Sequence, residues 1–242
     1  MTLKAVIFDF NGVIINDEAI HQQLIEEMLL SENLVMNKGE YQHLCLGHSA
    51  GACLSDLLRA RGRVVNEEIL TKLLLQKAQS YTAELEKLDK LPLYSGLDDF
   101  IFQARTRNIH LGIVSGAIRQ EIEFVLEHSQ LNQYFSVIIS GDDITTSKPE
   151  ADGYKLAIQK LNIAHPQLNL QPKECLAIED TPPGITAAKR AGIQVVGIAN
   201  TYPFHMLQRQ ANWTVDYFTD LEWERIQEFF TNQPLQPTPE EC

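Results

Sequence analysis

Short apolar runs of four or five residues alternate with longer amphipathic segments over most of the chain. From about residue 97 onward, each apolar run is followed by a segment whose apolar positions lie three or four residues apart. Buried strands of a parallel sheet give the first pattern, and helices packed on the sheet give the second. The expected strands are 5–9, 110–114, 136–140, 175–178, 194–198 and a short one near Val215; the expected helices are 97–107, 119–127, 151–161, 182–191 and 221–230.

The segment 16–91 differs, because it has the amphipathic pattern of helices and no credible strand. Its helices are expected over 17–31, 50–61 and 66–90. The sequence LPLYSG at 91–96 then interrupts the pattern as a domain junction would. Strands that alternate with helices indicate βαβ units. The sequence therefore predicts an α/β fold, in which residues 1–15 and 92–242 form a Rossmann-like, doubly wound parallel sheet and residues 16–91 form an inserted all-helical domain.

The composition is that of an ordinary globular protein. The 242 residues are 44% hydrophobic and 21% charged, and the net charge of −12 argues against a nucleic-acid partner. No apolar run approaches the roughly 18 residues of a membrane helix, and the N-terminus has no secretory pattern. The cysteines lack C-x-x-C spacing, which predicts free thiols in a reducing cytoplasm at Cys45, Cys53, Cys175 and Cys242. We expect a cytoplasmic monomer or weak dimer without a membrane partner, with a loosely held tail at 233–242.

Polar side chains follow three of the expected strands. They are Asp9 after the first strand, Ser115 and Gly116 after 110–114, and Glu179 and Asp180 after 175–178. Lys148 lies in a fourth polar stretch, just before the helix 151–161. In open α/β sheets, ligands bind at the edge where the parallel strands end. These residues are therefore expected to converge on one site.

Each of these positions also has a purely structural explanation. Asn11-Gly12 is a hairpin signal between two apolar runs, so that Asp9 could simply flank a turn. Ser115-Gly116 could be a plain strand-to-helix turn, and Lys148 could be a solvated lysine before a helix. The acids at 179–180 could favour a helix N-terminus. None of these explanations accounts for three acids, a hydroxyl and a lysine at the same sheet edge.

The set has the parts that phosphoryl transfer requires. Asp9 and Asp180 can hold Mg²⁺, which prefers oxygen ligands, and Glu179 can ligate it directly or through water. Ser115 and the backbone N–H groups near Gly116 and Ala117 suit phosphate oxygens. Lys148 can neutralise charge on the transferred group. Asp9 is then either a plain metal ligand or a covalent nucleophile, and the substrate is a small phosphorylated metabolite.

Four ordered motifs resemble the haloacid dehalogenase superfamily, in particular its phosphatases and phosphomutases with a helical cap after the first strand. They are FDFNGVI at 8–14, VSG at 114–116, SKPE at 147–150 and IEDTPPGITAAKRAG at 178–192. The run NDEAIH at 16–21 is similar to the cap entrance of the β-phosphoglucomutase-like branch. The insert 16–91 would then be the cap domain.

The resemblance also implies a role for each site residue. Asp9 would form an aspartyl-phosphate, which Ser115 and Lys148 would position and neutralise. Mg²⁺ would be bound by Asp9, the backbone carbonyl of Asn11 and Asp180, with Glu179 in support. In the cap, Gly47-His48-Ser49 would read the substrate, although an ordinary helix–helix turn would look the same. An arginine often found near this loop in sugar-phosphate enzymes is not evident.

Asn11 departs from the pattern of the superfamily, whose members mostly have there a second aspartate that acts as general acid and base. An amide cannot transfer a proton, and such help is typically worth about 10²–10⁴ in rate. The substrate could have a good leaving group, Asp17 or His21 could supply the proton, or the protein could be a slow or inactive phosphate-binding module. A phosphonatase would use a cap lysine, of which the sequence offers Lys38, Lys72 and Lys77. A phosphomutase fits less well, because it needs acid and base steps in both directions, and the long insert disfavours a receiver-like signalling domain.

Overall fold

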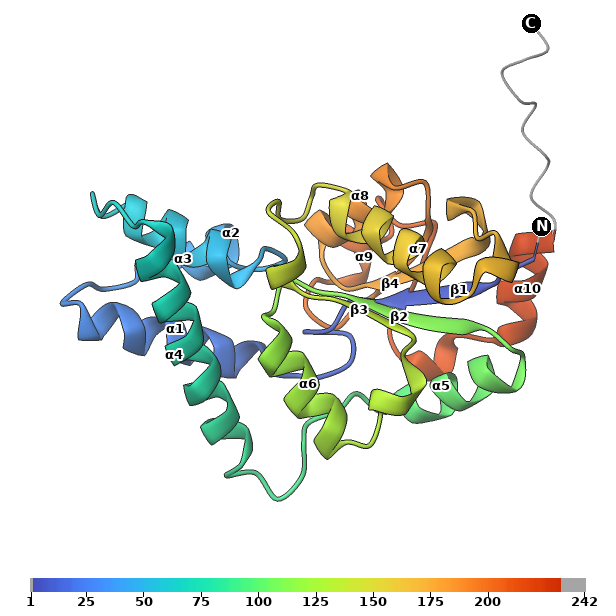
Figure 1. Ribbon diagram of the computed structural model, residues 1–242, viewed down its shortest axis with the longest axis horizontal. Helices are drawn as coiled ribbons and strands as arrows, with labels where there is room; N and C mark the ends of the chain where they lie inside the picture. Colours follow the sequence, from blue (N-terminus) through green and yellow to red (C-terminus); the bar gives the residue numbers. More distant parts are fainter. Residues whose placement is uncertain (1, 232–242) are drawn as a thin grey trace, which may run out of the picture.

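Six parallel strands form the central sheet of the computed structural model, which describes residues 2–231 (Figure 1). The strands are β1 (Ala5–Phe8), β2 (His110–Val114), β3 (Val137–Ile139), β4 (Cys175–Glu179), β5 (Gln194–Ile198) and β6 (Trp213–Val215). Their order is β3-β2-β1-β4-β5-β6, the order of a doubly wound sheet. The predicted fold class is confirmed. The expected tail at 233–242 lies outside the described residues.

The first strand is fully buried because helices cover both faces of the sheet. Val6 and Phe8 pack with α5 (Leu97–Thr106), α6 (Arg119–His128) and α10 (Trp223–Thr231). Ala5 and Ile7 point to the other face, against α7 (Asp152–Ala164), α8 (Pro182–Arg190) and α9 (Phe204–Leu207). This alternation is the two-residue period of a strand. Figure 1 shows the two helical layers on opposite sides of the sheet.

β1 pairs in parallel with β2 on one side and with β4 on the other. The hairpin interpretation of Asn11-Gly12 is therefore wrong, because the chain after β1 does not return as a paired antiparallel strand. The strand order also reverses between β1 and β4, since the chain builds β2 and β3 on one side before it crosses to the other. Such a switch point is where α/β sheets bind ligands.

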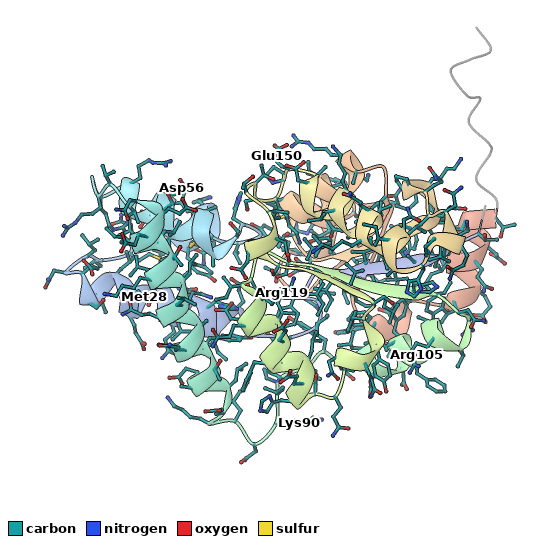
Figure 2. All side chains as sticks on the ribbon, in the orientation of Figure 1. Met28, Asp56, Lys90, Arg105, Arg119 and Glu150 are labelled. Atoms are coloured by element: carbon teal, nitrogen blue, oxygen red, sulfur yellow. A yellow bond between two sulfur atoms is a disulfide. The ribbon has the colours of Figure 1, made fainter. Side chains whose placement is uncertain are left out.

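The insert consists of helices only in the structure. They are α1 (Glu18–Ser31), α2 (Glu40–Leu44), α3 (Ala50–Arg59) and α4 (Glu67–Leu85). They share a hydrophobic cluster that includes Ile25, Leu29, Leu54 and Leu57, and side chains fill the space between them (Figure 2). The short α2 was not predicted. The helix expected over 66–90 ends at Leu85; Leu88 is 44% exposed, so its packing does not support a further turn.

Both ends of the insert leave the core at one place. Ile15 and Leu93 form an antiparallel bridge, and the Asn16 N–H donates to the carbonyl of Pro92 over 2.8 Å. These contacts agree with domain boundaries at residues 15/16 and 91/92, which stay a prediction. The insert is called the cap below, and the rest of the chain the core.

The expectation of free thiols is wrong for two of the four cysteines. Cys45 and Cys53 form a disulfide, with Cα atoms 4.6 Å apart, because the turn between α2 and α3 brings them together. A spacing of eight residues is no recognised motif, so the sequence did not indicate the pair. Cys175 is free and buried, and Cys242 lies outside the described residues. The cytoplasmic location stays a prediction that these two cysteines no longer support. Within residues 2–231, none of the helices has the length and apolar character needed to cross a bilayer.

Candidate active site

Asp9 is the first residue after β1 and lies at the switch point of the sheet. Its N–H donates to the carbonyl of Ile178 on the neighbouring strand over 2.9 Å, which continues the pairing by one residue. Its Oδ1 accepts the N–H of Phe10 over 2.7 Å and lies 2.9 Å from Nζ of Lys148. Asp9 is 6% exposed. The side chain is therefore held in one orientation at the floor of a pocket.

Three carboxylates meet at this point, as the strand ends predicted. Asp9, Glu179 and Asp180 each offer an oxygen within 4.8 Å of the others. They come together because Phe8 is in register with Ile178, so that β1 and β4 end side by side. Gly12 belongs to the same arrangement: its φ is +76°, and a Cβ there would lie 1.9 Å from Oδ2 of Asp180. The Asn-Gly turn thus lets the backbone pass directly against the acids.

Two oxygens of the acid cluster have no hydrogen-bond partner among the described residues. Oδ1 of Asp180 and Oε2 of Glu179 are buried, and within residues 2–231 neither has a hydrogen-bond partner. Burial raises the pKa of Asp180, and the charges of Asp9 and Glu179 raise it further. Buried oxygens without partners are costly unless a cation binds them. The donor set, carboxylates only, fits a hard cation such as Mg²⁺.

Lys148 joins two of these acids. Its Nζ lies 2.9 Å from Asp9 Oδ1 and 2.6 Å from Glu179 Oε1, which also accepts the hydroxyl of Tyr154 over 2.6 Å. Burial alone would lower the pKa of Lys148, but the charges of Asp9 and Glu179 outweigh it and raise that pKa. Lys148 is thus a fixed cation rather than the solvated lysine of the structural alternative. Tyr154 was missed because a tyrosine on an amphipathic helix looks like a core residue.

Two of the three residues expected to bind phosphate line the pocket that contains Asp9, and the third, Ser115, precedes them. Ser115 follows β2 and is 1% exposed, and its hydroxyl accepts the N–H of Ala117 over 3.0 Å. Gly116 and Ala117 line the same pocket as Asp9 and Lys148. The Gly116 carbonyl also accepts the N–H of Ala50 from the cap over 3.3 Å. This segment therefore forms part of the pocket and, at the same time, a contact to the cap.

The Asn11 side chain contacts Asp17, which precedes the first cap helix, and His21 within that helix. Nδ2 donates to Oδ2 of Asp17 over 2.9 Å and lies 2.8 Å from Nε2 of His21. His21 Nδ1 lies 2.8 Å from Nζ of Lys77, which forms an ion pair of 2.9 Å with Glu121. The structure thus brings both alternative proton donors to Asn11.

Among the cap lysines that the sequence could not separate, only Lys77 lines the pocket that contains Asp9. Lys38 and Lys72 are exposed. Lys77 is 3% exposed and is joined to Glu121 of the core helix α6. Glu121 was missed. It lies four residues before the buried Val125 and so shares the buried face of α6, where a glutamate needs a positively charged partner.

The loop of Gly47, His48 and Ser49 joins α2 to α3 and also contacts the core. The Ser49 N–H donates to the hydroxyl of Ser147 over 2.8 Å. Gly47 has φ +77°, and a Cβ there would lie 2.9 Å from the hydroxyl oxygen of Thr181. Gly47 and His48 both line the pocket. The loop is therefore more than a helix–helix turn, because it closes the pocket against the core.

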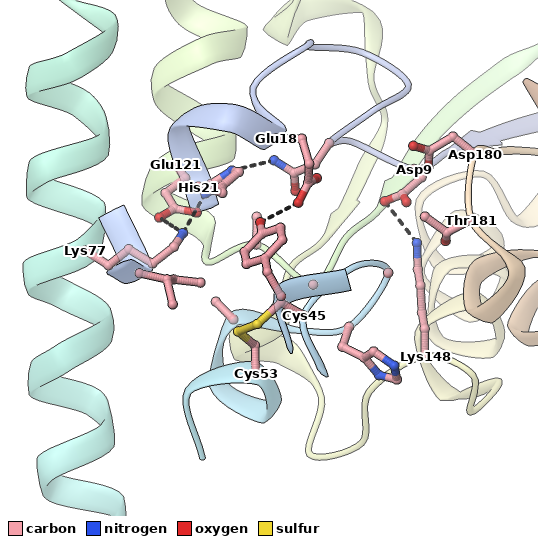
Figure 3. A pocket seen from close by; sticks show the side chains of 18 residues that line it. Asp9, Glu18, His21, Cys45, Cys53, Lys77, Glu121, Lys148, Asp180 and Thr181 are labelled. Atoms are coloured by element: carbon pink, nitrogen blue, oxygen red, sulfur yellow. Dashed lines mark hydrogen bonds and ion pairs between the residues drawn. A yellow bond between two sulfur atoms is a disulfide. The ribbon is translucent and has the colours of Figure 1, made fainter. Parts of the chain in front are cut away.

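The pocket between cap and core is open to solvent, and the centres of water-sized molecules can occupy ≈ 70 Å³ of it. Figure 3 shows Asp9, Lys148 and Asp180 on its core side and Glu18, His21 and Lys77 on its cap side. The arrangement can hold a divalent cation and a phosphoryl group next to Asp9, and an organic group against the cap.

Comparisons with known proteins agree with this chemistry. The model of the family described as haloacid dehalogenase-like hydrolase matches residues 6–198. A validoxylamine A 7'-phosphate phosphatase of Streptomyces hygroscopicus subsp. limoneus is 26% identical over 224 residues, which cover 92% of this chain and 98% of that protein. The beta-phosphoglucomutase of Bacillus subtilis is 26% identical over 229 residues, 92% and 96% of the two chains. The crystal structure of a beta-phosphoglucomutase from Clostridium difficile has the same fold, with a TM-score of 0.81 at 22% identity over 95% of this chain and 98% of that one.

Proposed function

The chain belongs to the haloacid dehalogenase-like hydrolase family, and we propose that it is a Mg²⁺-dependent phosphohydrolase that acts on a small phosphorylated metabolite through an aspartyl-phosphate at Asp9. The observation that carries this proposal is the meeting of Asp9, Glu179 and Asp180 within 4.8 Å, with Lys148 bonded to two of them. Phosphoryl transfer depends mainly on positioning and on the neutralisation of charge, and this cluster provides both.

In the proposed site, Asp9, Asp180 and the backbone carbonyl of Asn11 hold Mg²⁺, and Glu179 supports them. When bound, Mg²⁺ supplies positive charge against the transferred phosphoryl group. The two buried oxygens without partners, on Asp180 and Glu179, support this assignment. Lys148 keeps Glu179 and Asp9 in place through its two ion pairs.

Asp9 acts as the nucleophile in this proposal. Within residues 2–231, its hydrogen bonds are made by Oδ1, which leaves Oδ2 to attack phosphorus. The bond to the leaving oxygen breaks as the aspartyl-phosphate forms, and the leaving oxygen takes up a proton. Water then hydrolyses the aspartyl-phosphate to inorganic phosphate and free Asp9. Ser115, the N–H groups of Gly116 and Ala117, and Lys148 hold the phosphoryl oxygens.

Asn11 favours a second candidate function, that of a slow or inactive phosphate-binding protein. Its amide carries no transferable proton, and its Nδ2 is engaged by Asp17 over 2.9 Å. A phosphatase could still obtain the proton from Asp17 or His21, which lie at hydrogen-bonding distance from Asn11. A phosphonatase is less well supported, because Lys77 is paired with Glu121 rather than free. A phosphomutase is the least supported, since it needs proton transfer in both directions.

Hydrolysis of an aryl phosphate with Mg²⁺ tests the proposal, because an aryl leaving group needs little acid. We expect turnover in the wild type, none in Asp9→Asn, and full turnover in Asp99→Asn, a matched change of an exposed aspartate. A beryllium fluoride mimic of the phosphoryl group should bind the wild type and be lost in Asp9→Ala.

The two candidate functions give different outcomes in this assay. Turnover that survives Asp9→Asn, or a mimic that binds Asp9→Ala as well as it binds the wild type, would show that Asp9 is not the nucleophile. A wild type that binds the mimic without turnover, and gains turnover in Asn11→Asp, would instead support the phosphate-binding protein.

A further inference from the structure

Among the described residues, the cap side of the pocket has no unpaired lysine or arginine to bind a second anion; its other basic side chains are His21 and His48. Among the described residues that line the pocket there is no arginine, and its two lysines are Lys148 and Lys77. Lys148 is paired with Asp9 and Glu179 at the phosphate end. Lys77 is paired with Glu121 over 2.9 Å, with both side chains almost fully buried. An additional phosphate or carboxylate on the substrate would therefore face Glu18 without an unpaired lysine or arginine to bind it.

Glu18 is the acid of this wall that lacks an ionic partner. It begins α1 and lines the pocket, and one of its oxygens accepts the hydroxyl of Tyr41. Within residues 2–231, no donor contacts its other oxygen. Figure 3 shows Glu18 in the pocket, between His21 on the cap side and Asp9 on the core side.

Electrostatics also indicate that Glu18 is short of positive charge. Burial raises the pKa of Glu18, and the hydrogen bond from Tyr41 and the charge of His21 offset this only in part. Asp17 and Asp9 raise the pKa further, because each adds a negative charge nearby. A cation next to Glu18 would reverse these effects, since an opposite charge within about 4–6 Å favours the ionised carboxylate.

Resting on the proposed phosphatase function, we propose that the substrate is a phosphomonoester whose organic part carries a protonated amine that pairs with Glu18, and that it carries no second anionic group. The phosphoryl group lies at Asp9 and Lys148, and the amine lies at the cap wall. The two ends of the pocket thus bind substrate groups of opposite charge. Selectivity for the amine and against a second anion both come from Glu18.

Matched substrate pairs test this proposal. With Mg²⁺ at pH 7, we expect kcat/KM for glucosamine 6-phosphate to exceed that for glucose 6-phosphate by about tenfold or more, the range of a hydrogen bond to a charged group. We expect fructose 1,6-bisphosphate to be hydrolysed at least about tenfold less efficiently than fructose 1-phosphate. Glu18→Gln keeps the shape and hydrogen bonding of the side chain, and it should bring the amine preference close to one.

Glu27→Gln serves as the control, because Glu27 is an exposed glutamate on the same helix α1. This variant should keep the wild-type ratios. Equal kcat/KM for the two hexose phosphates, a preference for the bisphosphate, or an amine preference that survives Glu18→Gln would overturn the proposal.

Binding separates this proposal from the proposed function. If the wild type does not hydrolyse the aryl phosphate, the phosphatase assignment fails, and the affinities of Asp9→Asn for the same sugar phosphates, measured by calorimetry, decide the substrate class. Tighter binding of glucosamine 6-phosphate supports the amine site, and equal affinities overturn it. A Glu18→Gln protein that does not fold leaves the ratios of the wild type as the deciding measurement.

Discussion

Asn11→Asp places an ionisable group at the position where the resemblance to the superfamily implies a catalytic acid. The amide nitrogen of Asn11 lies 2.9 Å from Oδ2 of Asp17 and 2.8 Å from Nε2 of His21. A carboxyl in the same place would bring two carboxylates to about 3 Å, a distance at which both cannot remain ionised. The pair would therefore share a proton at neutral pH, and that proton lies next to the position of the leaving group.

The expected gain depends on how much the leaving group needs a proton. General acid–base help is typically worth about 10²–10⁴ in rate, or about 3–5 kcal/mol of activation free energy. Because Asp17 holds the shared proton as well, we expect less than this full effect. Asn11→Asp should raise kcat on an alkyl phosphate by about tenfold or more and leave kcat on an aryl phosphate nearly unchanged.

The assay compares phosphate release from the alkyl and the aryl ester in wild type and variant. Asn16→Asp is the matched control, because Asn16 is exposed and the change adds the same charge nearby. An unchanged rate on the alkyl ester would refute the reasoning and mean that Asp17 or His21 already acts as the acid. An equal gain on both esters would also refute it, since an effect independent of the leaving group is not acid catalysis.

The acid cluster and the cap loop each predict a measurable effect. Burial, with Asp9 next, raises the pKa of Glu179 from 4.5 to about 8 without metal, so the folded protein binds more protons than the unfolded chain in this interval. The Tm in EDTA should therefore fall as pH rises from 6 to 8, and a Tm in EDTA that rises with pH would contradict this. Mg²⁺ should raise the Tm more at pH 8 than at pH 6. A Mg²⁺ concentration of 100 times its Kd adds about 2.7 kcal/mol to the free energy of unfolding. In Gly116→Ala, the new Cβ would lie 2.7 Å from Cα of Ser49, so the loop must retreat and KM should rise in steady-state assays, whereas an unchanged KM would show that loop contact does not matter for binding.

The sequence predicted the sheet well because its strands are buried on both sides. Such strands are short apolar runs, and a single sequence is enough to distinguish them from amphipathic helices. The helix α2 was missed because its five residues, Glu40–Leu44, cover little more than one turn and show no period. The Cys45–Cys53 pair was missed because it depends on the path of the turn between two helices, which spacing alone does not give.

The meeting of Asp9, Ser115, Lys148 and Asp180 could be predicted, since parallel strands end at one edge. The cap side of the pocket could not. Glu18 and Lys77 lie on amphipathic helices, where charged residues normally face water, and their burial follows only from how the cap packs on the core. Sequence alone therefore predicted which acids and which lysine meet at the core side of the site, and the cap side needed the structure.

The two chain connections between the cap and the core lie side by side, which matters for how proteins with this core acquire different caps. The bridge between Ile15 and Leu93 and the hydrogen bond from Asn16 to Pro92 join the two connections outside the catalytic residues. The helices between them have a hydrophobic cluster of their own. A different helical unit could be spliced in at this junction if it also replaced the packing of Leu24, Tyr81 and Leu85 against the core. The junction thus lets the substrate-binding cap be exchanged while the core domain stays the same.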